Sequence, residues 1–168
     1  YMAGEGSKEQ CDTTTSSSSN SNTNLSQLQT ELQEAYQAER LDAFGLHVYG
    51  MVLKATKQRN NKLVVVTPQA VLMQSILQFP YNWSAWLDLA QVALADTAVE
   101  REIEELLGGV LAENFVFHFF CAHLQSQHQA HAEALRIYER WLDLLGGSPY
   151  VATQAAVVQY HLRLLGPS

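Results

Sequence analysis

Phe79-Pro80-Tyr81-Asn82-Trp83-Ser84-Ala85-Trp86-Leu87-Asp88-Leu89-Ala90-Gln91-Val92-Ala93 is the stretch of this chain that says most about its fold. Pro80 follows an apolar helical run and ends it, because proline lacks an N–H donor and its ring clashes with the preceding turn. Six residues later, Trp86 begins a Trp-x-x-Leu-Ala-x-x-Ala pattern, whose four apolar residues lie on one stripe of a helix. The small side chain of Ala90 allows a neighbouring helix to come close. The stretch therefore predicts two consecutive helices, the second of which packs against its neighbours.

Small residues recur at a spacing that indicates helical repeats. Gly50, Ala90, Ala122 and Ala156 take the equivalent place in four successive first helices, at intervals of 40, 32 and 34 residues. Tetratricopeptide repeats are helical hairpins of about 34 residues. The long first interval contains a basic and polar insertion, and the chain ends after the first helix of the fourth hairpin. We therefore predict an all-α fold, a tetratricopeptide-repeat-like α-solenoid of antiparallel helix pairs with about three and a half repeats, as a fragment of a longer solenoid.

The chain divides into a tail and a helical domain. Residues 1–23 are mostly Ser, Thr, Asn and Gly, and such a stretch buries too little apolar surface to offset its ordering entropy. We expect a low-complexity tail there and a helical domain over 24–168, whose first helix has only a thin apolar stripe. The Leu63-Val64-Val65-Val66 run lies within the insertion at residues 57–67, and we interpret it as an extended surface segment, with a lone strand as the alternative.

Capping signals predict where several helices begin. Asn24 is placed to cap the first helix, with Gln27 reaching back to it, and Thr67-Pro68 is a cap followed by proline at the first helical position. Thr97 and Glu100 form a capping box for a short acidic helix. Further helices are expected at residues 115–127, at residues 130–145 and from residue 149 to about residue 164.

Glycines predict close contacts and helix ends. Gly50 lies inside a helical pattern, where glycine costs about 1 kcal/mol relative to Ala, so we expect another backbone to approach it closely. Two Leu-Leu-Gly-Gly sequences, ending in Gly108-Gly109 and in Gly146-Gly147, have the composition of helix C-terminal stops. We expect both pairs to end helices.

Composition points to protein partners. The net charge is −7 and the ten Lys and Arg residues are scattered, so the chain lacks the basic surface of a nucleic-acid-binding protein. It contains no apolar run near the roughly 18 residues of a membrane helix and no secretion signal. Cys11 and Cys121 are expected to be a free thiol and a packing residue of a reducing, intracellular protein. We expect no cofactor and no small-molecule ligand.

Beyond the general repeat pattern, two segments resemble a particular family. Leu41-Asp42-Ala43-Phe44-Gly45-Leu46-His47-Val48-Tyr49-Gly50-Met51-Val52-Leu53 and Phe79-Pro80-Tyr81-Asn82-Trp83-Ser84-Ala85-Trp86-Leu87 are similar to the N-terminal part of the cell division cycle protein 23 family, tetratricopeptide subunits of the anaphase-promoting complex. The resemblance covers roughly residues 39–163 and excludes the tail and the insertion. It continues through Phe119-Phe120-Cys121-Ala122-His123, Glu133-Ala134-Leu135 with Tyr138, and Tyr150-Val151-Ala152-Thr153-Gln154.

This resemblance implies a non-catalytic scaffold in a multisubunit ubiquitin ligase that controls the cell cycle, located in the nucleus and cytoplasm. It also implies that the N-terminal repeats form a two-fold homodimer and that other subunits of the complex are partners. The insertion in the first hairpin departs from the family pattern, so the dimer contacts near it are not implied. A monomeric adaptor that binds a partner helix or peptide in the same groove is the alternative.

The register of the repeats predicts which residues line the concave groove. Such a groove is lined by first-helix residues six before, three before, one after and four after the small residue. Lys54 is the single Lys among these positions, so the groove is unlike one that holds an acidic C-terminus, and it suits an amphipathic helix. The candidate interface residues are Phe44, His47, Met51, Leu87, Gln91, Phe119, His123, Tyr150, Val157 and Tyr160.

Three kinds of chemistry compete with this scaffold hypothesis. A zinc site built from His118, His123, His128, His131 and Cys121, as in a small metal-dependent enzyme, is the rival from another class, but their spacing makes convergence of four ligands unfavourable. The acidic residues 100–105 match a solvated helix face better than catalytic carboxylates. Cys121 lies among aromatic residues without an evident base nearby. We therefore predict no catalytic and no metal-binding residues.

Overall fold

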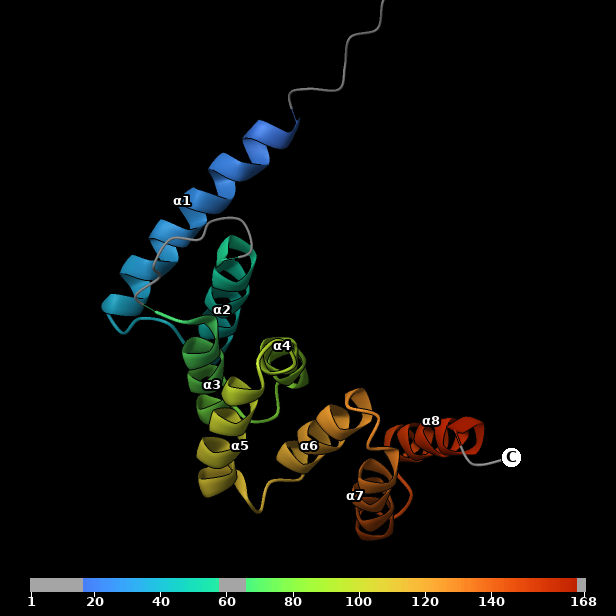
Figure 1. The fold of residues 1–168 in the computed structure, drawn as a ribbon. Coiled ribbons are helices and arrows are strands. Elements are labelled where there is room, and N and C mark those ends of the chain that lie inside the picture. The colour runs from blue at the N-terminus through green and yellow to red at the C-terminus, as the bar shows by residue number, and fades with distance from the viewer. Residues whose placement is uncertain (1–16, 58–65, 166–168) are drawn as a thin grey trace, which may run out of the picture.

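The computed structural model describes residues 17–57 and 66–165, and within these ranges it contains eight helices and no strand. Figure 1 shows them following one another across the molecule, with α1 at one end and α8 at the other. The helices are α1 (Ser17–Gln37), α2 (Ala43–Lys57), α3 (Pro68–Gln78), α4 (Trp83–Ala93), α5 (Thr97–Leu111), α6 (Phe115–Gln127), α7 (His131–Leu144) and α8 (Pro149–Leu165).

The helices pack in sequence order as hairpins. α2 packs with α3, α4 with α5 and α6 with α7, while α8 packs on α7 and α1 on α2. The first helices α4 and α6 also contact each other directly. This neighbour-to-neighbour packing is that of a solenoid and not of an up-and-down bundle, so the predicted all-α, tetratricopeptide-like architecture is confirmed. Within the described ranges, every helix is too short or too polar to cross a lipid bilayer.

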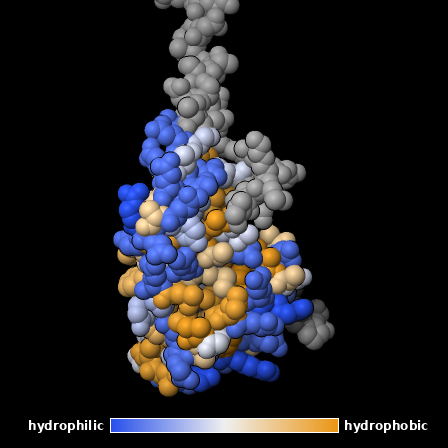
Figure 2. Space-filling view, turned by 90° about the vertical axis from the view of Figure 1, so that its left-hand side faces the viewer, coloured by the Kyte–Doolittle hydropathy of each residue, from blue (hydrophilic) through white to orange (hydrophobic). Residues whose placement is uncertain are grey.

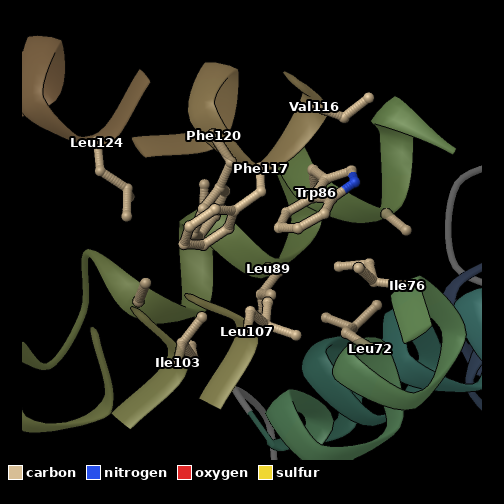
Figure 3. Packing of buried hydrophobic residues seen from close by; sticks show 13 residues of the cluster. Leu72, Ile76, Trp86, Leu89, Ile103, Leu107, Val116, Phe117, Phe120 and Leu124 are labelled. Carbon is tan, nitrogen blue, oxygen red and sulfur yellow. The ribbon is translucent and has the colours of Figure 1, made fainter. Parts of the chain in front are cut away.

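Trp86 lies at the centre of the largest core cluster, which joins α3 to α6 (Figure 3). Its side chain is completely buried, and its ring centroid lies 5.0 Å from that of Phe120. Its indole Nε1 donates a hydrogen bond to the carbonyl oxygen of Pro80 at 2.8 Å. The helix-ending proline and the Trp of the next helix are therefore joined directly, which fixes the angle between α3 and α4.

The small residues behave as predicted in three of the four hairpins. Gly50, Ala90 and Ala122 are buried, and a Cβ atom added at Gly50 would lie 2.6 Å from Cδ2 of Leu72. The close neighbour of Gly50 is therefore a side chain of α3, and the expected backbone approach was wrong in that detail. Ala156 is exposed, because α8 packs against α7 with the side of the helix that carries Ala155.

The helix starts were predicted in part. Oγ1 of Thr67 accepts a hydrogen bond from the Ala70 N–H at 3.3 Å and caps α3, as expected. Asn24 lies inside α1, seven residues after its start, so its predicted capping role is wrong. The cap of α5 is Asp96, whose carboxylate accepts from the Ala98 N–H at 2.9 Å, one residue before the predicted Thr97.

The two Gly-Gly pairs behave differently. Gly146 and Gly147 have φ angles of 64° and 92°, and α7 ends before them as predicted. Gly108 and Gly109 lie inside α5, which continues to Leu111, so the predicted stop there is wrong. Residues 1–16 of the predicted tail and most of the Leu63–Val66 run lie outside the described residues.

Candidate protein-interaction surface

The first helices of the hairpins, α2, α4, α6 and α8, form one surface, which we call the A-helix face. Side chains at predicted groove positions of successive hairpins meet on it. Nζ of Lys54 in α2 donates a hydrogen bond to Oε1 of Gln91 in α4 at 2.9 Å. The ring of Trp83, at the start of α4, lies 6.4 Å from the rings of His123 in α6 and Tyr150 in α8. Lys54 and Gln91 therefore lie on one face, as do His123 and Tyr150 around Trp83, and their role in binding stays a prediction.

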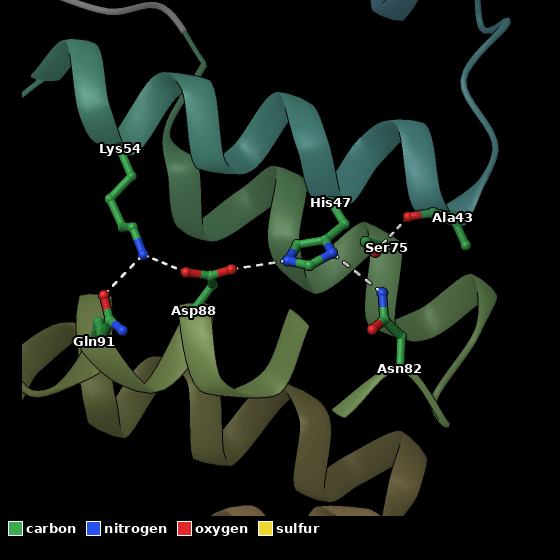
Figure 4. Close-up of polar contacts among 7 residues, drawn as sticks. All are labelled: Ala43, His47, Lys54, Ser75, Asn82, Asp88 and Gln91. Carbon is green, nitrogen blue, oxygen red and sulfur yellow. Dashed lines mark hydrogen bonds and ion pairs between the residues drawn. The ribbon is translucent and has the colours of Figure 1, made fainter. Parts of the chain in front are cut away.

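A polar cluster connects α2 to α4, and we call it the polar bridge (Figure 4). Asp88 is its centre, because one carboxylate oxygen contacts Nζ of Lys54 and the other lies 2.8 Å from Nε2 of His47. Nδ1 of His47 in turn lies 3.2 Å from Nδ2 of Asn82, and Gln91 completes the cluster through Lys54. Because Nε2 contacts Asp88 in α4 and Nδ1 contacts Asn82 in the preceding turn, the His47 ring is held between these two segments.

The electrostatics of the polar bridge favour an ionised Asp88. Burial alone would raise the pKa of this carboxyl group, but hydrogen bonds from Lys54 and His47, together with their charges, hold the pKa below its ordinary value. The carboxylate is therefore ionised at neutral pH and holds Lys54, the single Lys at a predicted groove position. A cation engaged in this way is not free to bind the carboxylate of a peptide C-terminus.

An aromatic cluster connects α4, α6 and α8, and we call it the aromatic bridge. It consists of Trp83, Phe119, His123 and Tyr150, with the rings of Phe119 and Tyr150 6.2 Å apart. Burial lowers the pKa of His123, so its imidazole is neutral at pH 7. Burial raises the pKa of the Tyr150 hydroxyl, while a hydrogen bond with Trp83 acts in the opposite direction. The bridge is thus uncharged at neutral pH.

Two exposed apolar stripes lie at the ends of the A-helix face. On α2, Phe44, Val48 and Met51 follow a helical spacing, and Phe44 is 57% exposed. On α8, Tyr150, Val157 and Tyr160 do the same, and Tyr160 is 61% exposed. The middle of the face, on α4 and α6, is more buried. Exposed apolar stripes of this kind mark candidate interaction sites.

The structure places the ten predicted interface residues in three groups. Those exposed on the stripes are Phe44, Met51, Tyr150, Val157 and Tyr160. Those in the middle of the face are His47, Leu87 and His123, which are partly buried, and Gln91, which is exposed. Phe119 is buried in the core of α6, α7 and α8, and its predicted place on the groove surface is wrong. It is buried because Tyr138, Trp141 and Tyr150 close around its ring.

Sequence reasoning missed three residues of this face. Asp88 and Trp83 connect the helices, and Val48 extends the stripe on α2. Opposite charges at Lys54 and Asp88, 34 residues apart, were a readable signal, because one repeat length brings residues to neighbouring positions on successive hairpins. Trp83 and Val48 carried no comparable signal.

The titratable side chains considered for chemistry are separated in the structure. His118 Nε2 donates to the Ala112 carbonyl at 2.8 Å, and His128 lies 2.8 Å from a carboxylate oxygen of Glu100. His131 is buried and contacts Gln129. Burial raises the pKa of the Cys121 thiol to about 12, which leaves it un-ionised and unreactive. In the described ranges, no group of three or more His, Cys, Asp or Glu side chains is placed to hold a metal ion.

Comparison with known proteins gives a consistent result. The family model described as Anaphase promoting complex subunit 8 / Cdc23 matches residues 1–156. Anaphase-promoting complex subunit 8 of Arabidopsis thaliana and the cell division cycle protein 23 homolog of Homo sapiens are each 30% identical to this chain over 97% of its length. Anaphase-promoting complex subunit 8 of Dictyostelium discoideum is 32% identical over 73% of this chain.

The matches cover only part of those relatives. The aligned region is 27% of the Arabidopsis protein, 26% of the human protein and 19% of the Dictyostelium protein. This chain therefore spans about a quarter of the length of the first two.

Proposed function

Because the chain belongs to the Anaphase promoting complex subunit 8 / Cdc23 family, we propose that it forms part of an anaphase-promoting complex subunit that acts in cell-cycle control. Within that ubiquitin ligase complex, the chain serves as a non-catalytic scaffold that forms a homodimer through its A-helix face and contacts other subunits. The two apolar stripes on α2 and α8 are the observation that carries the proposal.

The chemistry of the A-helix face favours a helix as its occupant. An amphipathic helix binds a groove through residues at helical spacing, and exposed apolar residues on α2 and α8 offer such contacts from two sides. Lys54 is engaged by Asp88, and the aromatic bridge is uncharged, so the face offers little to a charged peptide terminus. The occupant gains its binding energy mainly by covering apolar surface.

A second copy of the chain could cover the A-helix face, because it carries the same two apolar stripes. In a two-fold dimer, the same patch of both copies meets its equivalent, so an exposed stripe on one copy faces an apolar surface on the other. Each apolar side chain that becomes buried contributes about 1.5–3 kcal/mol. The six stripe residues on each copy are 44–61% exposed, so each can contribute part of this amount to a homodimer.

Light scattering of the purified chain across concentration tests this proposal. We expect a dimer at tens of micromolar. Met51→Glu and Tyr160→Glu, which place a charge on each stripe, should each weaken dimerisation at least about tenfold, because a buried unpaired charge is costly. Leu106→Glu, at an exposed position of α5 outside the A-helix face, is the matched control and should leave the dimer unchanged.

A chain that stays monomeric at these concentrations would contradict the homodimer and favour the monomeric adaptor. We also propose a location in the nucleus and cytoplasm, which fluorescence imaging of the tagged full-length protein tests directly. Exclusion from both compartments would contradict that part.

A further inference from the structure

A row of four aromatic side chains runs along one edge of the solenoid, where first helices begin and second helices end. We call Phe44, Phe79, Tyr81 and Phe115 the aromatic ridge. Neighbouring ring centroids along it are 5.6, 5.9 and 6.0 Å apart. Phe79 and Tyr81 are 39% and 60% exposed. In Figure 2, orange hydrophobic residues gather on the lower part of the side that carries α3 and α5, whereas blue residues cover the part near α1.

A pocket of about 470 Å³ lies at the Tyr81–Phe115 end of this ridge. Its wall consists of these two aromatic residues and of the last turn and the following loop of α5, from Gly109 to Asn114. The Tyr81 and Phe115 rings, tilted by 37° to each other, both line the pocket. Val110, which is 69% exposed, adds an apolar side chain at the wall. A flat or elongated apolar group fits between these surfaces.

Three features of this pocket favour a positive charge. The C-terminus of a helix carries partial negative charge, and α5 has no basic residue in its last turn to compensate it. Glu113 is an acidic residue of the lining, and none of the described residues that line the pocket is basic. Aromatic faces attract cations. The negative helix end, the carboxylate and the two rings therefore act on the same site.

We propose that this pocket binds a Lys or Arg side chain of a partner protein, whose neighbouring apolar residues lie along the aromatic ridge. Arginine fits best, because its planar guanidinium stacks on aromatic rings while its N–H groups can donate to a carboxylate. The net charge of −7 attracts a basic segment over a longer distance. The pocket shares no residue with the apolar stripes on α2 and α8, so the charge recognition does not depend on the proposed homodimer. Only Phe44, at the far end of the ridge, belongs to both the ridge and the α2 stripe.

Nuclear magnetic resonance of the whole chain tests this site with two probes that differ only in charge. N-acetyl-arginine amide is the first probe, and N-acetyl-citrulline amide is its neutral control. We expect the arginine probe to shift the amide signals of residues 109–115 and to bind at least about tenfold more tightly than the citrulline probe. Equal binding of both probes would overturn the proposal.

Two variants and one control locate the charge. Glu113→Gln and Tyr81→Leu should each weaken binding of the arginine probe several-fold, and the exposed positions of both residues leave the fold intact. Glu133→Gln, at an exposed position of α7, should have no effect. Shifts spread evenly over the acidic surface, or an equal loss in the Glu133 variant, would show unspecific attraction and overturn the proposal. Shifts at residues 109–115 that depend on protein concentration alone would make a second copy the occupant and overturn it as well.

Discussion

The polar bridge and the aromatic bridge join successive first helices of the same solenoid by opposite means. Between α2 and α4, Asp88 holds Lys54 and His47 in an ion-paired cluster. Between α4, α6 and α8, the rings of Trp83 and Tyr150 do the joining. The repeat geometry is common to both regions, so the geometry fixes where the helices meet and leaves the chemistry of the contact to the sequence.

This difference assigns different roles to the two ends of the A-helix face. In the polar bridge the charges of Lys54 and Asp88 pair with each other and fix α2 to α4. The polar groups at that end of the face are therefore occupied mainly by contacts within the chain. The aromatic bridge leaves Tyr150 partly exposed next to the stripe on α8. An uncharged, partly exposed aromatic surface can gain further contact area from a partner. We therefore propose that a partner gains more additional contact at the α8 end than at the polar bridge.

The largest effect is expected from the core that both bridges share. Trp86→Ala removes a completely buried side chain from the cluster that joins α3 to α6. The free energy of unfolding should fall by about 3–5 kcal/mol, as for other buried Trp residues. Urea denaturation followed by circular dichroism measures it. Leu106→Ala, at an exposed position of α5, should change it by less than about 0.5 kcal/mol. An equal loss of unfolding free energy in both variants would contradict the central role of Trp86 in the core.

A pair of glycine substitutions compares a crowded and an open position. A Cβ at Gly50 would lie 2.6 Å from the buried Leu72, so Gly50→Ala should lower the free energy of unfolding by a net amount of about 1–2 kcal/mol, even after the gain in helix propensity. A Cβ at Gly109 would meet nothing within 4 Å. Gly109→Ala should therefore raise the free energy of unfolding by about 0.5–1 kcal/mol. Thermal denaturation of both variants is the measurement, and the same sign for both would contradict the packing described.

The polar bridge predicts a loss of stability at acidic pH. Asp88→Asn should lower the free energy of unfolding at pH 7 by about 1–2 kcal/mol, because Lys54 and His47 lose a charged acceptor. The pKa of Asp88 is lowered by folding, so its stabilisation is present above the unfolded pKa of about 3.9 and is lost as pH falls through the folded value. The difference between wild type and variant should vanish in acid. Asp143→Asn, at an exposed position of α7, should show no such dependence.

The aromatic bridge predicts a smaller effect in a different pH range. Burial lowers the pKa of His123, so below the unfolded value of about 6.5 the unfolded chain takes up a proton before the folded chain does. The wild type should lose stability relative to His123→Phe as pH falls from neutral to the folded pKa of His123. Denaturation curves between pH 5 and pH 7.5 test this range. If His123→Phe and Asp88→Asn responded over one and the same range, the two bridges would not be chemically distinct.

The fold was predictable because its signals are local and repeated. Pro80, the Trp86 pattern and the spacing of small residues predicted helices and pairing correctly. Leu-Leu-Gly-Gly occurs twice but ends only α7, because glycine permits positive φ without requiring it. At Gly108-Gly109 the buried Ile103 and Leu107 hold α5 on the core, and the helix continues for two residues beyond. Tertiary packing outweighs a local stop signal there.

The repeat position of each candidate site residue could be read from the sequence, but the burial of its side chain could not. Position within the repeat predicted groove places for His47, Gln91 and Tyr150; all three contact side chains of a neighbouring first helix, and their role in an interface stays a prediction. The same rule placed Phe119 at the surface, but burial there depends on which aromatic residues of α7 and α8 close over it, and this is not visible in a single helix. Pairing between Lys54 and Asp88 was encoded one repeat apart, so long-range pairs of this kind are readable once the repeat is known.

Photo-cross-linking from position 157 tests the homodimeric A-helix face most directly. Val157, 46% exposed on α8, is replaced by benzoylphenylalanine, and ¹⁴N- and ¹⁵N-labelled copies are mixed so that mass spectrometry separates links between copies from links within one copy. The account predicts mixed-isotope cross-links from position 157 to residues of α2, α4, α6 or α8. Mixed-isotope cross-links to α3, α5 and α7 alone, or links confined to a single copy, would contradict it.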